Sequence, residues 1–278
     1  WVEEKTAGRV RAVDVASISL ELIRCGGPAA VAEKLRALPR GSVCVVNAAA
    51  PRDMEVVAAA TLAAEKAGSR FLYRTAAAWV AARIGQSPHG LLSSAAFTTD
   101  TAHGGLVIVG SYVPKTTTQL QALLANDRLT AIELSVTDLL EPAARASTLA
   151  HAIAAMNRAI AAGRDTVVYT SRTLITSTDA ATSLDIGRRV SDALIAIVQG
   201  LAVTPRYLIA KGGITSSDTA THGLGVRRAV VLGQAIPGVP VWQLGAESKY
   251  PGLGYVVFPG NVGADTALAN LVARLHPV

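Results

Sequence analysis

The sequence is poor in cysteine and in aromatic residues, and it contains no long uninterrupted apolar run. Its two cysteines, Cys25 and Cys44, lie outside any CxxC spacing and are too few for a disulfide framework, which fits a reducing compartment. Polar residues, glycines or prolines interrupt every apolar run before the roughly 20 residues that a membrane span needs. No basic segment precedes an apolar stretch and a small-residue cleavage site, so we expect no secretory signal. These absences favour a soluble, cytoplasmic protein with no membrane partner.

Positive charge is scattered rather than concentrated. The formal net charge of +6 comes mainly from dispersed arginines, and no aromatic residues alternate with them as a stacking platform for bases requires. The pattern therefore disfavours a nucleic-acid partner. A basic balance is also compatible with an enzyme that handles phosphates and acidic substrates. Half of the residues are hydrophobic, which is enough to bury a sizeable core in one large domain or two.

Segments with helical and strand periodicity alternate along the chain, as expected for parallel sheets covered by helices. In the N-terminal part we expect helices over residues 18–26, 28–38, 53–67 and 76–85 and strands over 42–49 and 70–75. In the C-terminal part we expect strands over 106–110, 129–136, 165–171, 206–213 and 255–263, and helices over 116–126, 144–163, 183–200 and 264–275.

Residues 86–105 separate these two parts. They show no periodicity and are rich in serine, threonine, glycine and proline, which is typical of a linker or a long connection. We therefore expect a boundary near residue 100, with a partial α/β domain over residues 1–100 and a Rossmann-like domain over residues 101–278. The expected fold class is α/β, with parallel or mixed sheets covered by helices.

Three loops of the second part share a chemistry that suits an anion. Each joins a strand to a helix through glycine and a side-chain hydroxyl or amide, at residues 110–118, 212–218 and 259–263. Glycine lets backbone amides approach a ligand closely, and a helix N-terminus offers them unpaired N–H groups. Ligands of open parallel sheets bind beyond the carboxyl ends of the strands. The loops therefore indicate a phosphate site, although the same residue types also cap helices and form turns.

No common catalytic or nucleotide signature is complete. GSYVPKT resembles a P-loop but lacks the glycine before Lys115, and GLGVRR and GLGYVV lack the third glycine of a dinucleotide fingerprint. Lys115 can still reach a phosphate as a point charge, or be an exposed lysine at a helix start. The five histidines have no metal-site spacing, and there is no GxSxG elbow. A metal centre built on histidine and a serine hydrolase are therefore not expected.

Long segments of the sequence resemble one enzyme family. GSYVPKTTTQ, AKGGITSSDTATHGLGVRRAVVLGQAIPGVPVWQLG and YVVFPGNVG are similar to the nucleotide-binding half of the four-carbon acid sugar kinases. The resemblance continues upstream through GRVRAVDVASISLELIRCGGP, VVNAA and FLYRTAA, so it covers nearly the whole chain. It implies an enzyme that uses ATP and Mg²⁺ to phosphorylate threonate, erythronate or an oxo-tetronate.

Carried onto this sequence, the resemblance implies a set of residues around ATP: Ser111, Gly212, Gly213, Ile214, Thr215, Ser216, Gly260, Asn261, Val262 and Gly263. Asp218 would orient a metal-bound water, or cap a helix. Arg74 and Thr75 could grip a substrate carboxylate, because arginine presents a forked set of donors, or Arg74 could belong to an ion pair at a strand end.

The catalytic base is not assigned. The family begins with a DDxTG segment that is implied to hold the acid-sugar site and the base, and no such segment occurs here. The resemblance therefore implies that the sequence is the later part of a longer kinase and is inactive by itself. Two other functions stay open: a non-catalytic nucleotide or small-molecule binding module, and a lyase or isomerase acting on a phosphorylated sugar acid. The acid sugar, its stereochemistry and the phosphorylated hydroxyl are not predicted, and a homo-oligomer is possible because a partial sheet leaves an unpaired edge.

Overall fold

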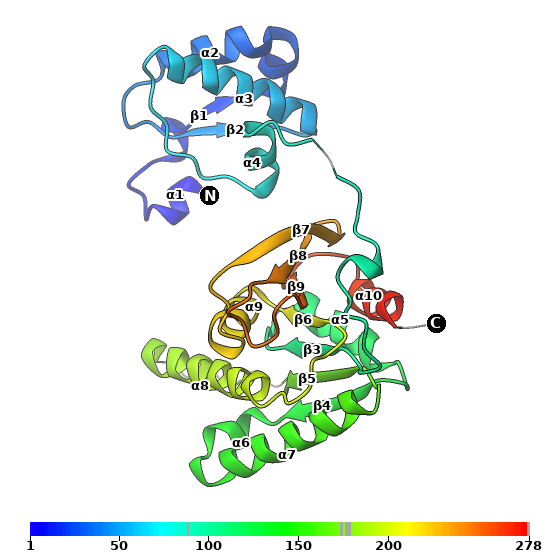
Figure 1. Ribbon diagram of the computed structural model, residues 1–278. Coiled ribbons are helices and arrows are strands. Elements are labelled where there is room, and N and C mark those ends of the chain that lie inside the picture. The colour runs from blue at the N-terminus through cyan, green and yellow to red at the C-terminus, as the bar shows by residue number, and fades with distance from the viewer. Residues whose placement is uncertain (88, 173–174, 176–178, 277–278) are drawn as a thin grey trace. The chain divides into compact units, whose positions relative to one another are not determined.

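The computed structural model describes residues 1–87, 89–172, 175 and 179–276. The chain divides into two compact units, Trp1–Pro88 and His89–Val278, and each has its own hydrophobic core. In Figure 1 the first unit is blue to cyan and the second runs from green to red.

The division falls before residue 100 because the segment that follows Pro88 belongs to the second unit. Leu92 and Phe97 pack against the core of that unit. The N–H of Thr99 also donates to the carbonyl of Arg206 at 2.8 Å. Although much of this segment has no regular structure, its side chains and backbone are therefore tied to the larger sheet.

The first unit is a small α/β structure. Its parallel strands β1 (Ala16–Ile18) and β2 (Cys44–Val46) form a two-stranded sheet. The helices are α1 (Val2–Lys5), η1 (Ala12–Asp14), η2 (Leu22–Gly26), α2 (Gly27–Ala37), α3 (Pro51–Lys66) and α4 (Ala77–Arg83). Ile18, Val31, Val57 and Trp79 are buried together in its core.

Asp53 fixes the start of α3. Its Oδ2 accepts hydrogen bonds from the N–H groups of Ala49 and Ala50, both at 3.0 Å. The guanidinium of Arg24 donates to both carboxylate oxygens, at 2.9 and 3.0 Å. The bond from Arg24, followed by that from Ala49, lowers the pKa of Asp53 to about 2. The helix N-terminus and the preceding η2 are thereby joined through one carboxylate.

Two sequence expectations for this unit are wrong. Residues 70–75 form no strand, and Leu72 is fully exposed; Tyr73 instead packs its ring 5.4 Å from that of Trp79 and donates to Glu65 at 2.6 Å. Apolar residues in this segment thus reflect ring packing on helices rather than strand pairing. The expected helix over residues 18–26 begins late, because Ile18 ends β1.

The second unit is built on a seven-stranded sheet with the order β4-β5-β3-β6-β9-β8-β7. The strands are β3 (Leu106–Val109), β4 (Thr130–Leu134), β5 (Thr166–Thr170), β6 (Leu208–Lys211), β7 (Ala229–Ile236), β8 (Val239–Leu244) and β9 (Gly254–Phe258). Neighbours from β4 to β9 are parallel, whereas β8 is antiparallel to both β9 and β7. The sheet is therefore mixed, and the expected fold class is confirmed.

Helices cover both faces of this sheet (Figure 1). They are α5 (Pro114–Leu124), α6 (Val136–Leu140), α7 (Pro142–Ala161), α8 (Ala180–Gln199), α9 (Gly213–Asp218), η4 (Thr219–Gly223) and α10 (Ala267–Leu275), with η3 (Ser94–Ala96) in the connection before β3. Leu106 and Ile108 pack with α7 and α8, whereas Val107 and Val109 pack with α5 and α10. Continuous burial of β3 follows from this double cover. Within the described residues, no helix combines the length and apolarity needed to cross a membrane.

The hairpin of β7 and β8 is absent from the sequence expectations. Val230 and Val231 on β7 are 61% and 66% exposed, and the pairing is irregular around Gly233, so the usual alternation of an edge strand is blurred. One local signal does mark the hairpin. Pro237 and Gly238 lie between the strands, and Gly238 has a φ of +78°, as a tight Pro-Gly turn requires.

Candidate functional site

The turns that follow β3, β6 and β9 lie side by side at one edge of the large sheet (Figure 1). These strands are parallel neighbours, and their pairing aligns Val109, Lys211 and Phe258 at the carboxyl edge. The three glycine loops singled out in the sequence begin directly after these residues. The fold therefore brings distant segments together at the edge where open parallel sheets bind ligands.

Close approach of these turns depends on glycine. Gly212 has a φ of +118°, and a Cβ there would lie 2.9 Å from Cβ of Ser111. A Cβ on Gly260 would lie 3.3 Å from Oγ of Ser111. Ser111 is thus the point that the other two turns approach. Gly213 differs, because a Cβ at that position meets no atom within 4 Å.

The residues after Gly212 form a helix rather than an open loop. The Oγ atom of Ser216 lies 2.7 Å from the carbonyl oxygens of both Ala210 and Gly212, and Thr215 and Ser216 are buried. These hydroxyl residues therefore stabilise the junction between β6 and α9. Ile214, in contrast, is 77% exposed on the first turn of α9. Among the residues expected around ATP, Gly213 and Ile214 are the exposed members of this segment.

Helix α5 holds the third turn in place. Oγ1 of Thr116 donates to the carbonyl of Gly260 at 2.9 Å. Nε2 of Gln119 donates to the carbonyls of Val262 and Ala264 at 2.9 and 2.8 Å. Both side chains are fully buried. Thr116 belongs to the hydroxyl-rich loop 110–118 that the sequence singled out, whereas sequence reasoning missed Gln119, because a polar residue on a helix ordinarily indicates its solvent face.

The remaining members of the third turn are more open. Asn261 and Gly263 are exposed, and Val262 is half-buried. Gly263 has a φ of +87°, and a Cβ there would lie 2.7 Å from that of Ala267. The turn is therefore shaped by glycine at its end and offers the Asn261 side chain to solvent.

Lys211 is the buried cation of this edge. Its side chain is 0% exposed, and Nζ donates to the carbonyls of Pro259 and Gly260 at 2.6 and 3.2 Å. Nζ also lies 4.2 Å from the ring centroid of Phe258. Burial, followed by the charge of Lys115, lowers the pKa of Lys211 to about 8. The sequence carries one signal for it: LIAK is a strand whose last residue is a lysine and whose other residues are apolar.

A second cation reaches the edge from the end of β5. Nη2 of Arg172 donates to the carbonyl of Ser111 at 2.7 Å and to Oγ1 of Thr117 at 2.8 Å. Its Nε and Nη1 atoms are buried and have no hydrogen-bond partner among the described residues. Burial also lowers the pKa of Arg172. Arg172 therefore joins β5, the Ser111 turn and the start of α5, and the sequence analysis did not identify it.

Lys115 lies at the rim of the same edge. Its Nζ lies 2.7 Å from Oδ1 of Asp265, and both side chains are largely exposed. This ion pair connects the start of α5 to the segment before α10. An exposed pair of this kind contributes little stability, so Lys115 can exchange Asp265 for another anion at low cost.

Asp218 is turned toward a neighbouring helix. It is the last residue of α9, and its carboxylate accepts a hydrogen bond from the hydroxyl of Ser191 on α8. In the described residues, no group of three or more His, Cys, Asp or Glu side chains is placed to hold a metal ion. A Mg²⁺ ion carried by phosphates needs only one or two protein carboxylates. Asp218 therefore fits such an ion only if phosphate oxygens of a ligand supply the other metal ligands.

Arg74 and Thr75 belong to the first unit. Both are exposed, and the guanidinium carbon of Arg74 lies 4.4 Å from the ring centroid of Trp1. The ion pair that was the alternative for Arg74 is not formed with any described residue. A guanidinium stacked on a ring keeps its edge available for a planar carboxylate.

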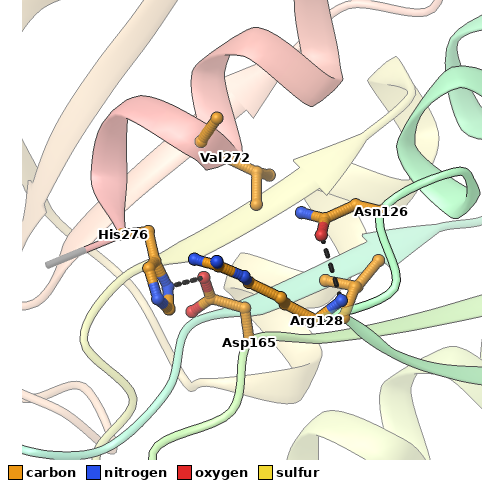
Figure 2. Close-up of a pocket in the computed structure, with 7 residues that line it drawn as sticks. Asn126, Arg128, Asp165, Val272 and His276 are labelled. Carbon is orange, nitrogen blue, oxygen red and sulfur yellow. Dashed lines mark hydrogen bonds and ion pairs between the residues drawn. The ribbon is translucent and has the colours of Figure 1, made fainter. Parts of the chain in front are cut away.

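A separate pocket of about 290 Å³ lies at the opposite, amino edge of the sheet. Figure 2 shows Arg128 and Asn126, which precede β4, facing Asp165 before β5 and His276 after α10. Nδ1 of His276 lies 3.1 Å from Oδ2 of Asp165, and Oδ1 of Asp165 accepts the N–H of Gly105 at 2.6 Å. The His276–Asp165 contact thus joins the end of α10 to the starts of β3 and β5. Ligands of open parallel sheets bind at the other edge.

Two domain families match the chain. The family described as a nucleotide-binding C-terminal domain matches residues 106–268, which include all three turns. The family described as a sugar-binding N-terminal domain matches residues 1–83. A comparison with curated proteins gives no match.

Solved structures share the fold at low sequence identity. A Salmonella typhimurium LT2 protein superposes with a TM-score of 0.60 at 17% identity, over 94% of this chain and 58% of its own. A Haemophilus influenzae protein gives 0.55 at 18% identity, over 93% and 60%. A Bordetella bronchiseptica domain of unknown function, solved with bound citrate as a domain-swapped dimer, gives 0.51 at 18% identity, over 94% and 59%. The chain thus spans about three fifths of the length of these proteins.

Proposed function

Because this chain belongs to the four-carbon acid sugar kinase family, we propose that its second unit binds ATP for transfer of the γ-phosphoryl group to a sugar acid. The acceptor is a hydroxyl of threonate, erythronate or an oxo-tetronate. The observation that carries the proposal is the convergence of three glycine turns at the carboxyl ends of three parallel neighbouring strands. The proposed place of action is the cytoplasm.

The proposed ATP contacts are the residues of the three turns: Ser111, Gly212, Gly213, Ile214, Thr215, Ser216, Gly260, Asn261, Val262 and Gly263. Their geometry supports two roles, contact with the phosphates and shaping of the turns. Gly213 and Asn261 are exposed and could meet the phosphates directly, whereas Thr215 and Ser216 are buried and shape the turn. Glycine at 212 and 260 lets the backbones approach closely, as a cradle for phosphates requires.

Catalysis of phosphoryl transfer is mostly positioning and charge neutralisation. Lys115 and Arg172 provide positive charge at the rim and beside Ser111. Mg²⁺, when bound with ATP, supplies further neutralisation of the phosphates. Asp218 is the carboxylate proposed to orient a metal-bound water. Ser191 donates to its Oδ2 atom only, so the carboxylate retains acceptor capacity for a water. The base that deprotonates the acceptor hydroxyl is not assigned to a residue of this chain.

The sugar acid is assigned to the first unit. Residues 1–83 match a sugar-binding family, and Arg74 and Thr75 are the proposed partners of the substrate carboxylate. A Bordetella bronchiseptica relative with bound citrate supports a small polycarboxylate or hydroxy acid as the kind of ligand. Its domain-swapped dimer likewise supports a homo-oligomer for this protein.

Calorimetric titration with Mg²⁺ and AMP-PNP tests the nucleotide site. We expect binding by the chain and loss of binding in Gly213→Val and Gly260→Val variants whose circular dichroism matches the parent. Gly213→Val is the cleaner variant, because a Cβ there meets no atom within 4 Å. A Gly90→Val variant, at a position that also leaves a Cβ free of contacts, is the matched control.

Three outcomes separate the candidate functions. Nucleotide binding that both turn variants lose supports the nucleotide site, which the kinase shares with a non-catalytic nucleotide-binding module, and phosphorylation of a sugar acid then distinguishes the kinase. Binding of a sugar phosphate together with indifference to AMP-PNP would support a lyase or isomerase instead. If both variants bind the nucleotide with unchanged affinity, the turns are not part of the nucleotide site.

A further inference from the structure

Lys211 is a buried charge without a carboxylate partner. In the described part of the chain, no acidic side chain lies within salt-bridge distance of its Nζ atom. Nζ is held instead by the carbonyls of Pro259 and Gly260, at 2.6 and 3.2 Å, and by the ring of Phe258. A buried ammonium ion is costly unless it is paired, and two carbonyl dipoles compensate it only partly. The ammonium group of Lys211 therefore leaves uncompensated positive charge beneath the Pro259–Gly260 turn.

The position of Lys211 connects that charge to the edge of the sheet. β6 is the strand between β3 and β9, so its last residue lies at the centre of the three turns. The carbonyl of Gly260 accepts from both Lys211 and Thr116. The peptide group of Gly260 thus lies between the ammonium ion and a ligand bound to the outer side of the third turn.

The neighbouring charges do not neutralise it. Lys115, on α5, repels Lys211, and it is itself paired with Asp265 on the segment before α10. Arg172, at the end of β5, adds another positive charge beside Ser111.

Asp218, at the end of α9, adds a carboxylate that is hydrogen-bonded to Ser191. Three cations thus face two carboxylates, those of Asp265 and Asp218, and the remaining positive charge is one that an anion at the turns would balance.

We infer that Lys211 is the buried counter-charge of the nucleotide phosphates, so that nucleotide binding and protonation of this lysine are coupled. The inference rests on the proposed function, because it takes the three turns as the phosphate site. Lys211 acts through the Pro259–Gly260 turn without contact to the ligand and is a positioning residue. Its role goes beyond holding the turn, since a neutral hydrogen-bond donor could do that alone.

The coupling has a definite sign. The pKa of Lys211 is about 8 in the free chain, so a large part of the molecules carry it neutral above that pH. An anion nearby favours the charged form and raises the pKa. Binding at pH 8 therefore takes up protons, to a limit of about half a proton per nucleotide, and affinity falls between pH 7 and pH 9 by up to about tenfold, the limit reached when the bound pKa lies well above 9.

Calorimetric titration with Mg²⁺ and ADP measures the proton directly. The titration is made at pH 8 in two buffers of different ionisation enthalpy, and the difference in binding enthalpy gives the protons taken up. ADP is the probe because its terminal phosphate, with a pKa of roughly 6, is already ionised at this pH. The dissociation constant is then followed from pH 7 to pH 9.

Four variants assign the proton. Lys211→Met should bind more weakly at pH 7 and take up no proton. Lys211→Arg should retain binding without proton uptake, because a guanidinium stays charged over this pH range. This variant also provides the test if Lys211→Met does not fold. Lys115→Met should move the midpoint of the pH dependence to higher pH, because one repelling charge is removed. Lys249→Met is the control, since Lys249 also donates to a main-chain carbonyl, that of Gln199 at 2.5 Å, but at an exposed position away from the three turns.

Proton uptake that disappears in both Lys211 variants and persists in Lys249→Met is the expected result. ADP binding without proton uptake, or uptake that survives in Lys211→Arg, would overturn the coupling and leave the proposed nucleotide site standing. Absence of ADP binding at every pH would overturn the coupling and the proposed site together.

Discussion

Lys211 makes the stability of the free second unit depend on pH. Its pKa of about 8 in the folded chain is below the ordinary value of 10.5, so between these values the unfolded chain binds more protons. Stability therefore rises with pH from about 8 to 10.5. From pH 7 to pH 9 this residue alone should add about 1 kcal/mol to the free energy of unfolding.

Urea unfolding of the ligand-free chain at pH 7 and pH 9 checks this prediction. The gain should vanish in Lys211→Met, which has no titrating group at that position. A gain of equal size in the variant would assign the pH dependence to other groups. The nucleotide affinity and the free stability should thus respond to pH in opposite directions.

Two adjacent glycines should respond differently to substitution. Gly212→Ala places a Cβ 2.9 Å from that of Ser111 on a backbone with a φ of +118°, and should cost about 1–3 kcal/mol of stability. Gly213→Ala meets no atom within 4 Å, and should change stability by less than about 1 kcal/mol. Thermal unfolding of the two variants provides the comparison, and equal losses would contradict the described turn.

The sequence singles out candidate site residues only where their chemistry is local. Gly212 and Gly260 stand out because each closely follows an apolar strand, although glycine there also suits a turn or a helix cap. Lys211 and Arg172 act through contacts with distant segments. Their partners, Pro259 and Ser111, lie nearby because of the order of strands in the sheet, and the spacing of residues along the sequence does not reveal that order. Asp218 was expected at a helix start and lies instead at the end of α9.

At the scale of elements, α5 acts as the clamp of the third turn. Thr116→Val removes the hydroxyl that donates to the carbonyl of Gly260 at 2.9 Å and keeps the side-chain shape. We expect a loss of about 1–2 kcal/mol of stability, because the carbonyl loses one of its buried donors, and a weaker binding of Mg²⁺ and AMP-PNP.

Thr118→Val is the control for this prediction. Thr118 is exposed on the same helix and its hydroxyl lies 3.3 Å from the carbonyl of Pro114, within α5. Its loss should leave nucleotide affinity unchanged. Equal affinity in the Thr116 and Thr118 variants would show that the clamp has no part in binding.

Strands with two buried faces were predicted well, and so was β4 at one edge, but the β7–β8 hairpin at the other edge was not. β3 is a short apolar run between glycines, and β6 is apolar up to Lys211 and is followed by two glycines, so both patterns indicate buried strands. β7 lies at the edge of the sheet with exposed valines, which gives neither alternation nor continuous burial. Residues 70–75 show the opposite error, a strand that was predicted and is not formed. Phe71 and Tyr73 pack in a cluster of aromatic rings and do not pair in a strand.

At the scale of the whole molecule, the two units have separate cores and should unfold separately. Asp53→Ala removes the cap of α3 and the partner of Arg24, so it should lower only the transition of the first unit. The contribution of Asp53 is present above its ordinary pKa of 3.8 and is lost as the pH falls toward about 2.

Differential scanning calorimetry of the chain checks this separation. Glu55→Ala is the matched control, because Glu55 lies on the same helix and makes an exposed ion pair with Arg52. It should leave both transitions in place. A shift of both transitions by Asp53→Ala would indicate that the two units unfold as one.

The central claim is that nucleotide phosphates lie on the three turns after β3, β6 and β9. A crystal structure of the chain with Mg²⁺ and AMP-PNP tests it most directly. We predict phosphate density against Ser111, Gly213 and Gly260. Density in the pocket of Asp165 and His276, at the opposite edge of the sheet, would contradict the account.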